Sequence, residues 1–299
     1  MKPEFPVKAR NRLFSEDDFR TIRAIIAANP ETSRQDIARE VCLTLAWYQP
    51  NGALKLMGCK AALLSFHRQG WIQLPPARHK VPHLNQVKPP QRTLEGEPRE
   101  PIQTPAGRLL PLTLEPVVPG GTSRLWNEFM DRYHYLEYSI QKGAQQRYLI
   151  QSSQGYVGAI SFASPAWKTQ ARDDWIGWDH ETRTRNLHYI VNNTRFLILP
   201  WVQSKNLASK VLGLCARQLP RDWEVRYGYR PVLLETFVEQ QRFQGTCYKA
   251  ANWIRVGETK GRGKWEQKGE HKVRAPLPIK DIFVYPLQPN FREVLKETP

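Results

Sequence analysis

A short polar segment between an apolar strand and a helix has the residue types to hold a phosphate. Residues 196–202 predict a strand, and residues 203–208 open a helix that runs to about residue 219. Backbone N–H groups at a helix N-terminus bind anions, and asparagine tolerates the positive φ that such a loop needs. We therefore expect a phosphate of a coenzyme or of a nucleic-acid backbone to bind at Gln203, Asn206, Leu207 and Ala208.

This order of strand, loop, helix and second apolar strand (residues 231–238) resembles the acyl-CoA-binding half of the GNAT acetyltransferase fold. The GNAT loop has the pattern Gln/Arg-x-x-Gly-x-Gly/Ala, and here Asn206 replaces the first glycine. The resemblance also implies an acidic tyrosine about four residues before the glycine that ends the next conserved helix. Counting back from Gly257 reaches Trp253, and Tyr248 lies five residues earlier still. We therefore expect the fold without ordinary acetyl transfer, and acetyl-CoA as a secondary candidate ligand.

Glu235 is a carboxylate in the middle of an apolar strand. Such a group is costly to bury unless it is paired or functional. It either pairs with a buried arginine, such as Arg172, Arg183 or Arg195, or joins Asp173 in a site. In the second case Glu235 and Asp173 would hold Mg²⁺ or Mn²⁺ for phosphodiester chemistry, with Arg172 beside them.

Tyr133 and His134 form a second candidate catalytic pair. A tyrosine hydroxyl beside a histidine has the groups needed for nucleophilic attack. The alternative is that alternate residues of one helix pack into the core while the others face water. Both interpretations stay open at this point.

The net charge of +16 and the pI of about 9.8 favour a polyanionic partner. The segment between Arg242 and Arg274 carries nine lysines or arginines against three glutamates. Glycines there let a backbone approach phosphates, and an aromatic ring can stack on a base. We expect this basic tail to contact DNA through Lys260, Arg262, Lys264 and Trp265, although a solvated hairpin loop is an equal alternative.

Residues 10–75 predict a separate N-terminal domain of three helices followed by a strand at 71–74. Ser15 and Ser33 each precede an aspartate by three residues, as helix-capping residues do, and Gly70 is typical of a helix end. The order is typical of a winged-helix domain. Its third helix would read DNA with Lys55, Lys60 and Arg68, off an apolar face of Met57, Ala61 and Leu64.

Residues 76–108 predict a proline-rich linker, because residues 75–119 hold 11 of the 24 prolines. Residues 109–299 then predict an α+β domain: a helix at 125–138, a hairpin around residues 152–155, a loop at 172–178, and the strand–helix–strand unit described above. The scattered cysteines and the lack of a long apolar run favour a cytoplasmic protein outside the membrane.

Longer motifs in the second domain carry a family resemblance. They include Tyr133-His134-Tyr135-Leu136, Trp175-Ile176-Gly177-Trp178, Arg195-Phe196-Leu197-Ile198-Leu199-Pro200-Trp201, Leu234-Glu235-Thr236-Phe237-Val238 and Gly245-Thr246-Cys247-Tyr248. With them the chain resembles the Druantia A family, a component of an anti-phage defence system with relatives in mobile elements. Glu137 departs from the glycine expected after the first motif. The resemblance implies action on DNA and other defence or transposon proteins as partners, and it implies no established mechanism.

These observations lead to three hypotheses about function. The first is a DNA-binding nuclease or transposase-like protein that cleaves or transfers strands. The second is a GNAT-type acyltransferase acting on a nucleic-acid-bound substrate, such as charged tRNA. The third is a non-catalytic DNA-binding adaptor, and a homo-oligomer is compatible with each.

Overall fold

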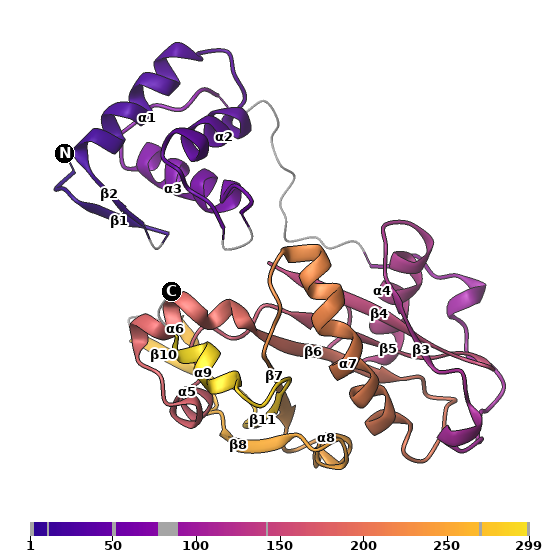
Figure 1. The fold of residues 1–299 in the computed structure, drawn as a ribbon. Coiled ribbons are helices and arrows are strands. Elements are labelled where there is room, and N and C mark those ends of the chain that lie inside the picture. The colour runs from indigo at the N-terminus through magenta and orange to yellow at the C-terminus, as the bar shows by residue number, and fades with distance from the viewer. Residues whose placement is uncertain are drawn as a thin grey trace. The chain divides into compact units, whose positions relative to one another are not determined.

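The computed structural model divides the chain into two compact units, Met1–Gln86 and Val87–Pro299. It describes residues 3–10, 12–49, 52–76, 89–141, 143–268 and 271–297, with the backbone alone over 262–268 and 271–275. Figure 1 shows the ribbon of both units. Each unit is considered by itself below.

The first unit is a small helical domain with one hairpin. Its elements are β1 (Val7–Ala9), β2 (Arg12–Phe14), α1 (Glu16–Ala28), α2 (Arg34–Thr44) and α3 (Leu56–Arg68). The predicted caps are confirmed: Ser15 and Asp18 form a complete capping box, and the Ser33 side chain accepts from the Asp36 N–H. Because these caps satisfy orphan N–H groups, they fix where α1 and α2 begin. The helices then close over a core that includes Phe19, Ile22, Ile37 and Phe66.

Two predictions for this unit are wrong. Residues 71–74 form no strand, and the hairpin lies at the N-terminal side, where β1 pairs with β2. The buried stripe of α3 consists of Cys59, Ala62, Leu63 and Phe66, whereas Met57 is 76% exposed. Because the apolar residues of α3 come in short runs, its sequence is compatible with more than one buried face. Packing against the other helices determines which face is buried. The three helices are therefore as predicted, but the arrangement of a winged helix is not confirmed.

The second unit is built on a mixed seven-stranded sheet with the strand order β3-β4-β5-β6-β7-β11-β8. All neighbours are antiparallel except β6 and β7, which are parallel. The elements are β3 (Thr113–Pro116), α4 (Gly121–Tyr133), β4 (Gln145–Ser152), β5 (Gly155–Ala163), α5 (Gln170–Ile176), α6 (His180–Asn186), β6 (Ile190–Ile198), α7 (Leu207–Tyr227), β7 (Leu233–Glu239), α8 (Thr246–Ala250), β8 (Ile254–Glu258), β9 (Arg262–Lys268), β10 (His271–Pro276), β11 (Lys280–Pro286) and α9 (Phe291–Lys296).

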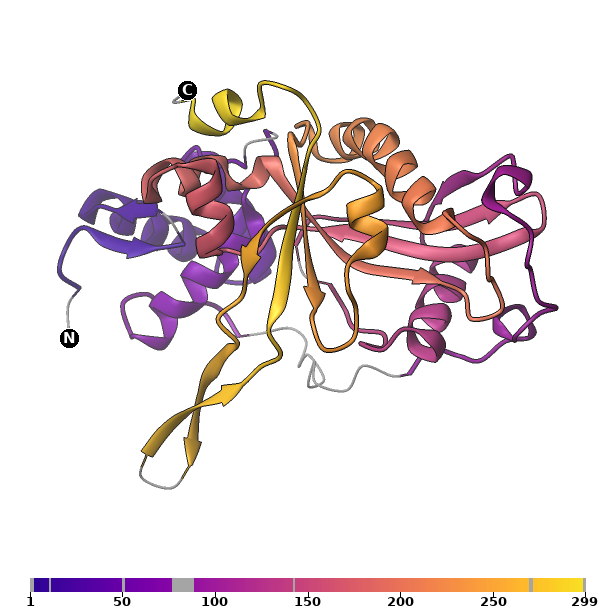
Figure 2. The same cartoon turned by 90° about the horizontal axis from the view of Figure 1, so that it is seen from below.

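Helices α4 and α7 cover opposite faces of this sheet, as Figure 2 shows. Arg147 of β4 donates to Asn127 of α4 at 2.8 Å, whereas the hydroxyl of its neighbour Tyr148 donates to Asp222 of α7 at 2.8 Å. Successive strand residues point to opposite faces, so β4 packs against a helix on each of its faces. β4 is apolar over residues 148–150 and β5 over most of its length. The mixed sheet with helices on both faces confirms the predicted α+β class.

Segment 172–178, which we predicted as a loop, is mostly the short helix α5. It ends at Gly177, whose φ of 75° lies in the left-handed region that favours glycine. The predicted hairpin at β4 and β5 is confirmed, with Ser152 paired to Gly155 across its turn.

Much of the proline-rich segment packs on the second unit, unlike the extended spacer that we predicted. Ile102 bridges to Val202, and its N–H donates to the Trp201 carbonyl at 2.8 Å. The fully buried Glu128 accepts from the Thr93 N–H at 2.8 Å and from its hydroxyl at 2.7 Å. The prolines leave few N–H groups to satisfy, so the segment can lie on a folded surface with a small number of anchoring bonds.

The buried carboxylate of Glu128 is the strongest of these anchors, because it also pairs with Arg132 at 2.8 Å. We predict that Glu128→Ala lowers the free energy of unfolding by about 2–4 kcal/mol, since it removes the acceptor of the partly buried Thr93 donors and one partner of Arg132. Urea denaturation of the full chain measures this. The control Glu97→Ala, at the half-exposed second partner of Arg132, should change stability by less than about 1 kcal/mol. Equal effects of the two changes would contradict this account.

Candidate functional site

The parallel strands β6 and β7 diverge and open a cleft in the middle of the sheet. They pair only over residues 190–193 of β6 and 233–236 of β7. Beyond that point β6 continues beside β5 to Ile198, and β7 continues beside β11 to Glu239. The backbone groups that face the gap therefore have no strand opposite them, and an extended ligand with amide groups could take that place.

A bulge in β6 explains where the strands separate. Ser161 of β5 pairs with Arg195 and the next residue, Phe162, pairs with Asn193, so Thr194 is extra. A bulge bends its strand and increases the local twist. Thr194 directly follows the last paired position of β6, so the bend turns the strand away from β7 at that point.

The cleft has a volume of about 920 Å³ and carries positive charge. Among the described residues that line it, the charged side chains are those of Arg195, Lys260 and Lys280, and no carboxylate contributes. Tyr133, Tyr135, Phe196, Phe237 and Phe243 supply much of the remaining wall. The cleft therefore favours an anionic ligand with an apolar portion.

The N-terminus of α7 reaches this cleft through Ala208. Asn206 adopts φ 65°, in the left-handed region, and its side chain makes no cap bond to the helix. The Leu207 N–H bonds the Ser204 carbonyl, and the Gln203 N–H bonds the Ile102 carbonyl. The rest of the first turn has no acceptor within the helix, so it remains available to an anion. Phosphate binding by Gln203, Asn206, Leu207 and Ala208 stays a prediction that this backbone geometry accommodates.

Tyr248 of α8 lies at the apex of the cleft. Its hydroxyl donates to Asn193 Oδ1 at 2.7 Å and lies 3.5 Å from Thr236 Oγ1. Asn193 and Thr236 are the last paired residues of β6 and β7. Burial raises the pKa of Tyr248 above its usual value, so the hydroxyl stays protonated at neutral pH.

The count in the sequence analysis started from Gly257, which lies in β8 and not at the end of a helix. Helix α8 ends at Ala250, and the left-handed residue that follows it is Asn252 with φ 62° rather than Gly257. Counting about four residues back from Asn252 reaches Tyr248. The tolerance of asparagine for positive φ, which was applied to Asn206, also applies here, and it was the signal that could have identified this tyrosine.

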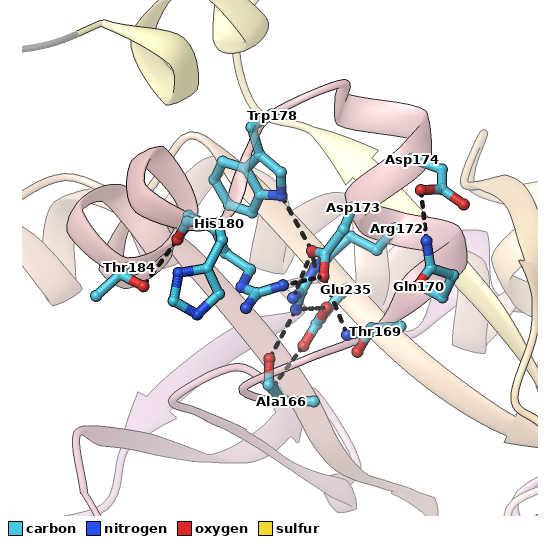
Figure 3. A network of polar contacts seen from close by, with 11 residues as sticks. Ala166, Thr169, Gln170, Arg172, Asp173, Asp174, Trp178, His180, Thr184 and Glu235 are labelled. Carbon is cyan, nitrogen blue, oxygen red and sulfur yellow. Dashed lines mark hydrogen bonds and ion pairs between the residues drawn. The ribbon is translucent and has the colours of Figure 1, made fainter.

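Arg172, Asp173 and Glu235 come together, as Figure 3 shows, but in a closed network beside the cleft. Arg172 Nη1 lies 2.8 Å from Glu235 Oε2, and Arg172 Nη2 lies 2.8 Å from Asp173 Oδ1. Arg183 and the Trp178 indole also donate to Asp173, and the Ala166 N–H donates to Glu235. The guanidinium of Arg172 thus bridges the two carboxylates, where a shared metal ion would have to lie.

This geometry supports the ion-pair interpretation of Glu235. Within the part of the chain that the structure describes, no group of three histidine, cysteine, aspartate or glutamate side chains is arranged to hold a metal ion. The proposed Mg²⁺ or Mn²⁺ ligands Asp173 and Glu235 therefore gain no support.

Tyr133 and His134 both line the cleft, and each makes a hydrogen bond there. The Tyr133 hydroxyl donates to the Gly96 carbonyl at 2.8 Å, and burial raises its pKa. His134 Nδ1 accepts from the Leu136 N–H at 3.1 Å, and burial together with Arg195 lowers the pKa of His134 to about 4. A neutral histidine with Nδ1 occupied is a poor base for a neighbouring tyrosine.

The residues expected to bind DNA are distributed over both units. On α3 Arg68 is exposed, and Lys60 Nζ lies 3.5 Å from Gln35 Oε1, while Lys55 is the residue that precedes the helix. Lys260 lines the cleft. Arg262, Lys264 and Trp265 belong to β9, and their side chains lie outside the described part of the structure. Their contacts with DNA stay predictions.

The strand order, the single parallel pair and the cleft at its divergence define the second unit as a GNAT-like α+β domain. The chain matches the family model described as Druantia protein DruA over residues 65–269. It therefore belongs to the DruA family of the Druantia system. No curated protein matches the chain. In the part of the chain that is described, no helix is both long and apolar enough to cross a membrane.

Several solved acetyltransferase structures are similar to the chain at low identity. An aminoglycoside acetyltransferase AAC(6')-Ib in complex with coenzyme A is 14% identical, with 58% of this chain and 94% of that chain covered and a TM-score of 0.38. FeeM, an N-acyl amino acid synthase from uncultured soil microbes, is 11% identical over 61% and 93%, with a TM-score of 0.35. A Bacillus subtilis acetyltransferase in complex with CoA is 8% identical over 59% and 99%, with a TM-score of 0.34. These superpositions are loose, so the GNAT-like assignment rests on the topology above.

Because Arg172 bridges two carboxylates in this buried network, we predict that its role is structural. Arg172→Met should lower the free energy of unfolding by about 3–5 kcal/mol, because it leaves Glu235 and Asp173 without their shared partner in the interior. Chemical denaturation measures the change, and Arg217→Met at an exposed site of α7 is the control, with an effect near zero. An Arg172→Met protein as stable as its parent would show that the network does not hold this region together.

The lowered pKa of His134 leads us to predict that the stability of the fold depends on pH. The unfolded histidine takes up a proton near about pH 6.5, whereas the folded one does so only near about 4. The unfolded state therefore binds more protons in this window, so the stabilisation is present above about pH 6.5 and is lost as the pH falls toward 4. His134→Asn, which keeps an acceptor for Leu136, should flatten that acid slope in urea denaturation measured across this pH range. Identical slopes in both proteins would contradict the prediction.

Proposed function

We propose that the second unit binds an acyl-coenzyme A in the cleft between β6 and β7 and transfers its acyl group to an acceptor. The observation that carries this proposal is the divergence of the only parallel strand pair among the described strands, with Tyr248 at its apex and the N-terminus of α7 at its side. The open strand edges suit the amide groups of a pantetheine arm, and the first turn of α7 suits a diphosphate.

The charges of the cleft agree with this ligand. Arg195, Lys260 and Lys280 line it without a carboxylate among the described lining residues, so the phosphates of a coenzyme would meet positive potential. A cleft of about 920 Å³ is large enough for a cosubstrate together with part of an acceptor.

Tyr248 would act as the general acid. When an acceptor nucleophile attacks the thioester carbonyl, the carbon–sulfur bond breaks and the leaving thiolate takes the phenolic proton. Asn193 and Thr236 hold the hydroxyl at the apex, which is where a thioester bound between the strands would place its sulfur. The acceptor amine or hydroxyl loses a proton in the same reaction, which restores the tyrosine through solvent.

Cleavage of DNA strands has less support from the geometry of the site. The carboxylates that would carry it, Asp173 and Glu235, are bound by arginines and by backbone or indole N–H groups. We therefore place acyl transfer first, in the setting that membership of the DruA family provides.

The proposal is tested by calorimetric measurement of acetyl-CoA binding to the full chain and to two variants at Asn206. Because Asn206 has φ 65°, Asn206→Gly should keep the loop and the affinity, whereas the β-branched Asn206→Val should strain the loop. We expect at least about tenfold weaker binding for Asn206→Val, equivalent to about 1.4 kcal/mol. Saturable binding that both variants retain would remove α7 from the site, and no binding by the parent would contradict the proposed function.

Tyr248→Phe separates binding from chemistry. The variant should keep the acetyl-CoA affinity of the parent and lose about 10²–10⁴-fold in acyl-transfer rate, which is the usual contribution of a general acid. Release of the CoA thiol with charged tRNA as acceptor measures the rate. Tyr133→Phe is the matched control, because Tyr133 also lines the cleft but its hydroxyl bonds the Gly96 carbonyl. Equal rates for Tyr248→Phe and the parent would exclude Tyr248 as the acid.

A further inference from the structure

Strands β9 and β10 form a two-stranded arm that is separate from the main sheet. They pair with each other in an antiparallel ladder, from His271 opposite Lys268 to Pro276 opposite Arg262, and they belong to a sheet of their own. In sequence the arm is inserted between β8 and β11, which are neighbours in the seven-stranded sheet. Figure 2 shows the arm extending away from that sheet.

The base of the arm forms part of the cleft wall. Thr259, Lys260, Gly261, Leu277 and Lys280 all line the cleft. The Leu277 N–H donates to the Gly261 carbonyl at 2.8 Å, and the Thr259 N–H donates to the Lys280 carbonyl at 2.9 Å. These bonds attach the root of the arm to the cleft.

Gly261 makes this close attachment possible. Its φ is 61°, and a Cβ at this position would lie 2.9 Å from the Leu277 carbonyl oxygen. Any other residue would strain the turn and push the two strands apart. Gly261 therefore allows the two ends of the arm to lie close together at the cleft.

The composition of the arm suits a polyanion. Between Arg262 and Arg274 the sequence has five lysines or arginines against two glutamates. An isolated two-stranded hairpin is marginally stable in water, and this one belongs to no larger sheet. A two-stranded ribbon has the width that the major groove of a duplex admits, and lysines and arginines along it would neutralise phosphates.

We infer that the β9–β10 arm is a nucleic-acid-binding surface that holds a phosphate backbone beside the cleft. An acidic protein would also meet positive charge, but the ribbon shape and the presence of Trp265 in the sequence favour a nucleic acid. For the acyl transfer proposed above, on which this consequence rests, the acceptor group is then carried by a nucleic acid. The binding itself does not depend on that reaction.

The test compares two triple variants of the full chain that lose the same charge. The arm variant carries Lys264→Gln, Lys268→Gln and Lys272→Gln. The control carries Arg124→Gln, Arg217→Gln and Arg221→Gln, which are exposed on α4 and α7. Fluorescence anisotropy measures the binding of double-stranded DNA, single-stranded DNA and RNA of one sequence over a range of salt concentrations, and calorimetry measures acetyl-CoA binding by the same proteins.

We expect the arm variant to lose at least about tenfold in affinity for one or more of these nucleic acids. The slope of log K against log salt should fall by about 2–3, as the loss of three phosphate contacts requires. The control variant should change both quantities much less, and the nucleic acid with the largest loss identifies the partner. Equal losses in the two variants, or unchanged affinity in the arm variant, would overturn the inference.

The measurement of acetyl-CoA binding distinguishes a failure of the arm assignment from a failure of the proposed acyl transfer. The arm variant should bind acetyl-CoA within about twofold of the parent, because it keeps Lys260, Lys280 and the other described residues that line the cleft. If the parent binds nucleic acid through the arm but does not bind acetyl-CoA, the proposed function fails while the assignment of the arm stands.

Discussion

The bulge at Thr194 is the constraint on which the rest of the second unit depends. It bends β6 directly after the residue that last pairs with β7, and it thereby leaves two strand edges open inside a sheet. Unpaired edges in the middle of a sheet are costly unless something else satisfies them, and here they border a cleft. The residues around the divergence are accordingly polar and bonded: Asn193 donates to the Ser161 carbonyl, and Thr236 donates to the Asn193 carbonyl.

Two sets of contacts hold this geometry. The network of Arg172, Asp173 and Glu235 ties α5 to β7 at the position where β7 still pairs with β6. On the other side, Tyr248 joins both strands through its hydroxyl at the apex. The ion-pair network therefore supports the paired part of β6 and β7, and Tyr248, the proposed acid, supports the point where they separate.

The sequence predicted the elements of the fold better than the contacts between them. Local signals such as the Ser15 cap, the turn before Gly155 and the apolar strand before Gln203 depend on neighbouring residues, and they identified the strand–loop–helix unit. The bulge at Thr194 depends on the register between β5 and β6, which no local pattern reveals. The partner of Glu235 was equally open, because Arg172, Arg183 and Arg195 all satisfied the same rule. The count toward a GNAT-type tyrosine passed over Tyr248 for a different reason: it started from Gly257, whereas Asn252 is the residue in the left-handed conformation after α8.

Amide hydrogen exchange with and without acetyl-CoA tests the central claim most directly. If the ligand lies between the diverging strands, exchange should slow at residues 195–198 of β6, at residues 237–239 of β7 and in the first turn of α7. The amides of α9, which contributes no residue to the cleft wall, would then be unchanged and serve as internal references. Protection elsewhere, or none at the diverging edges under saturating acetyl-CoA, would contradict the account of the cleft as an acyl-coenzyme A site.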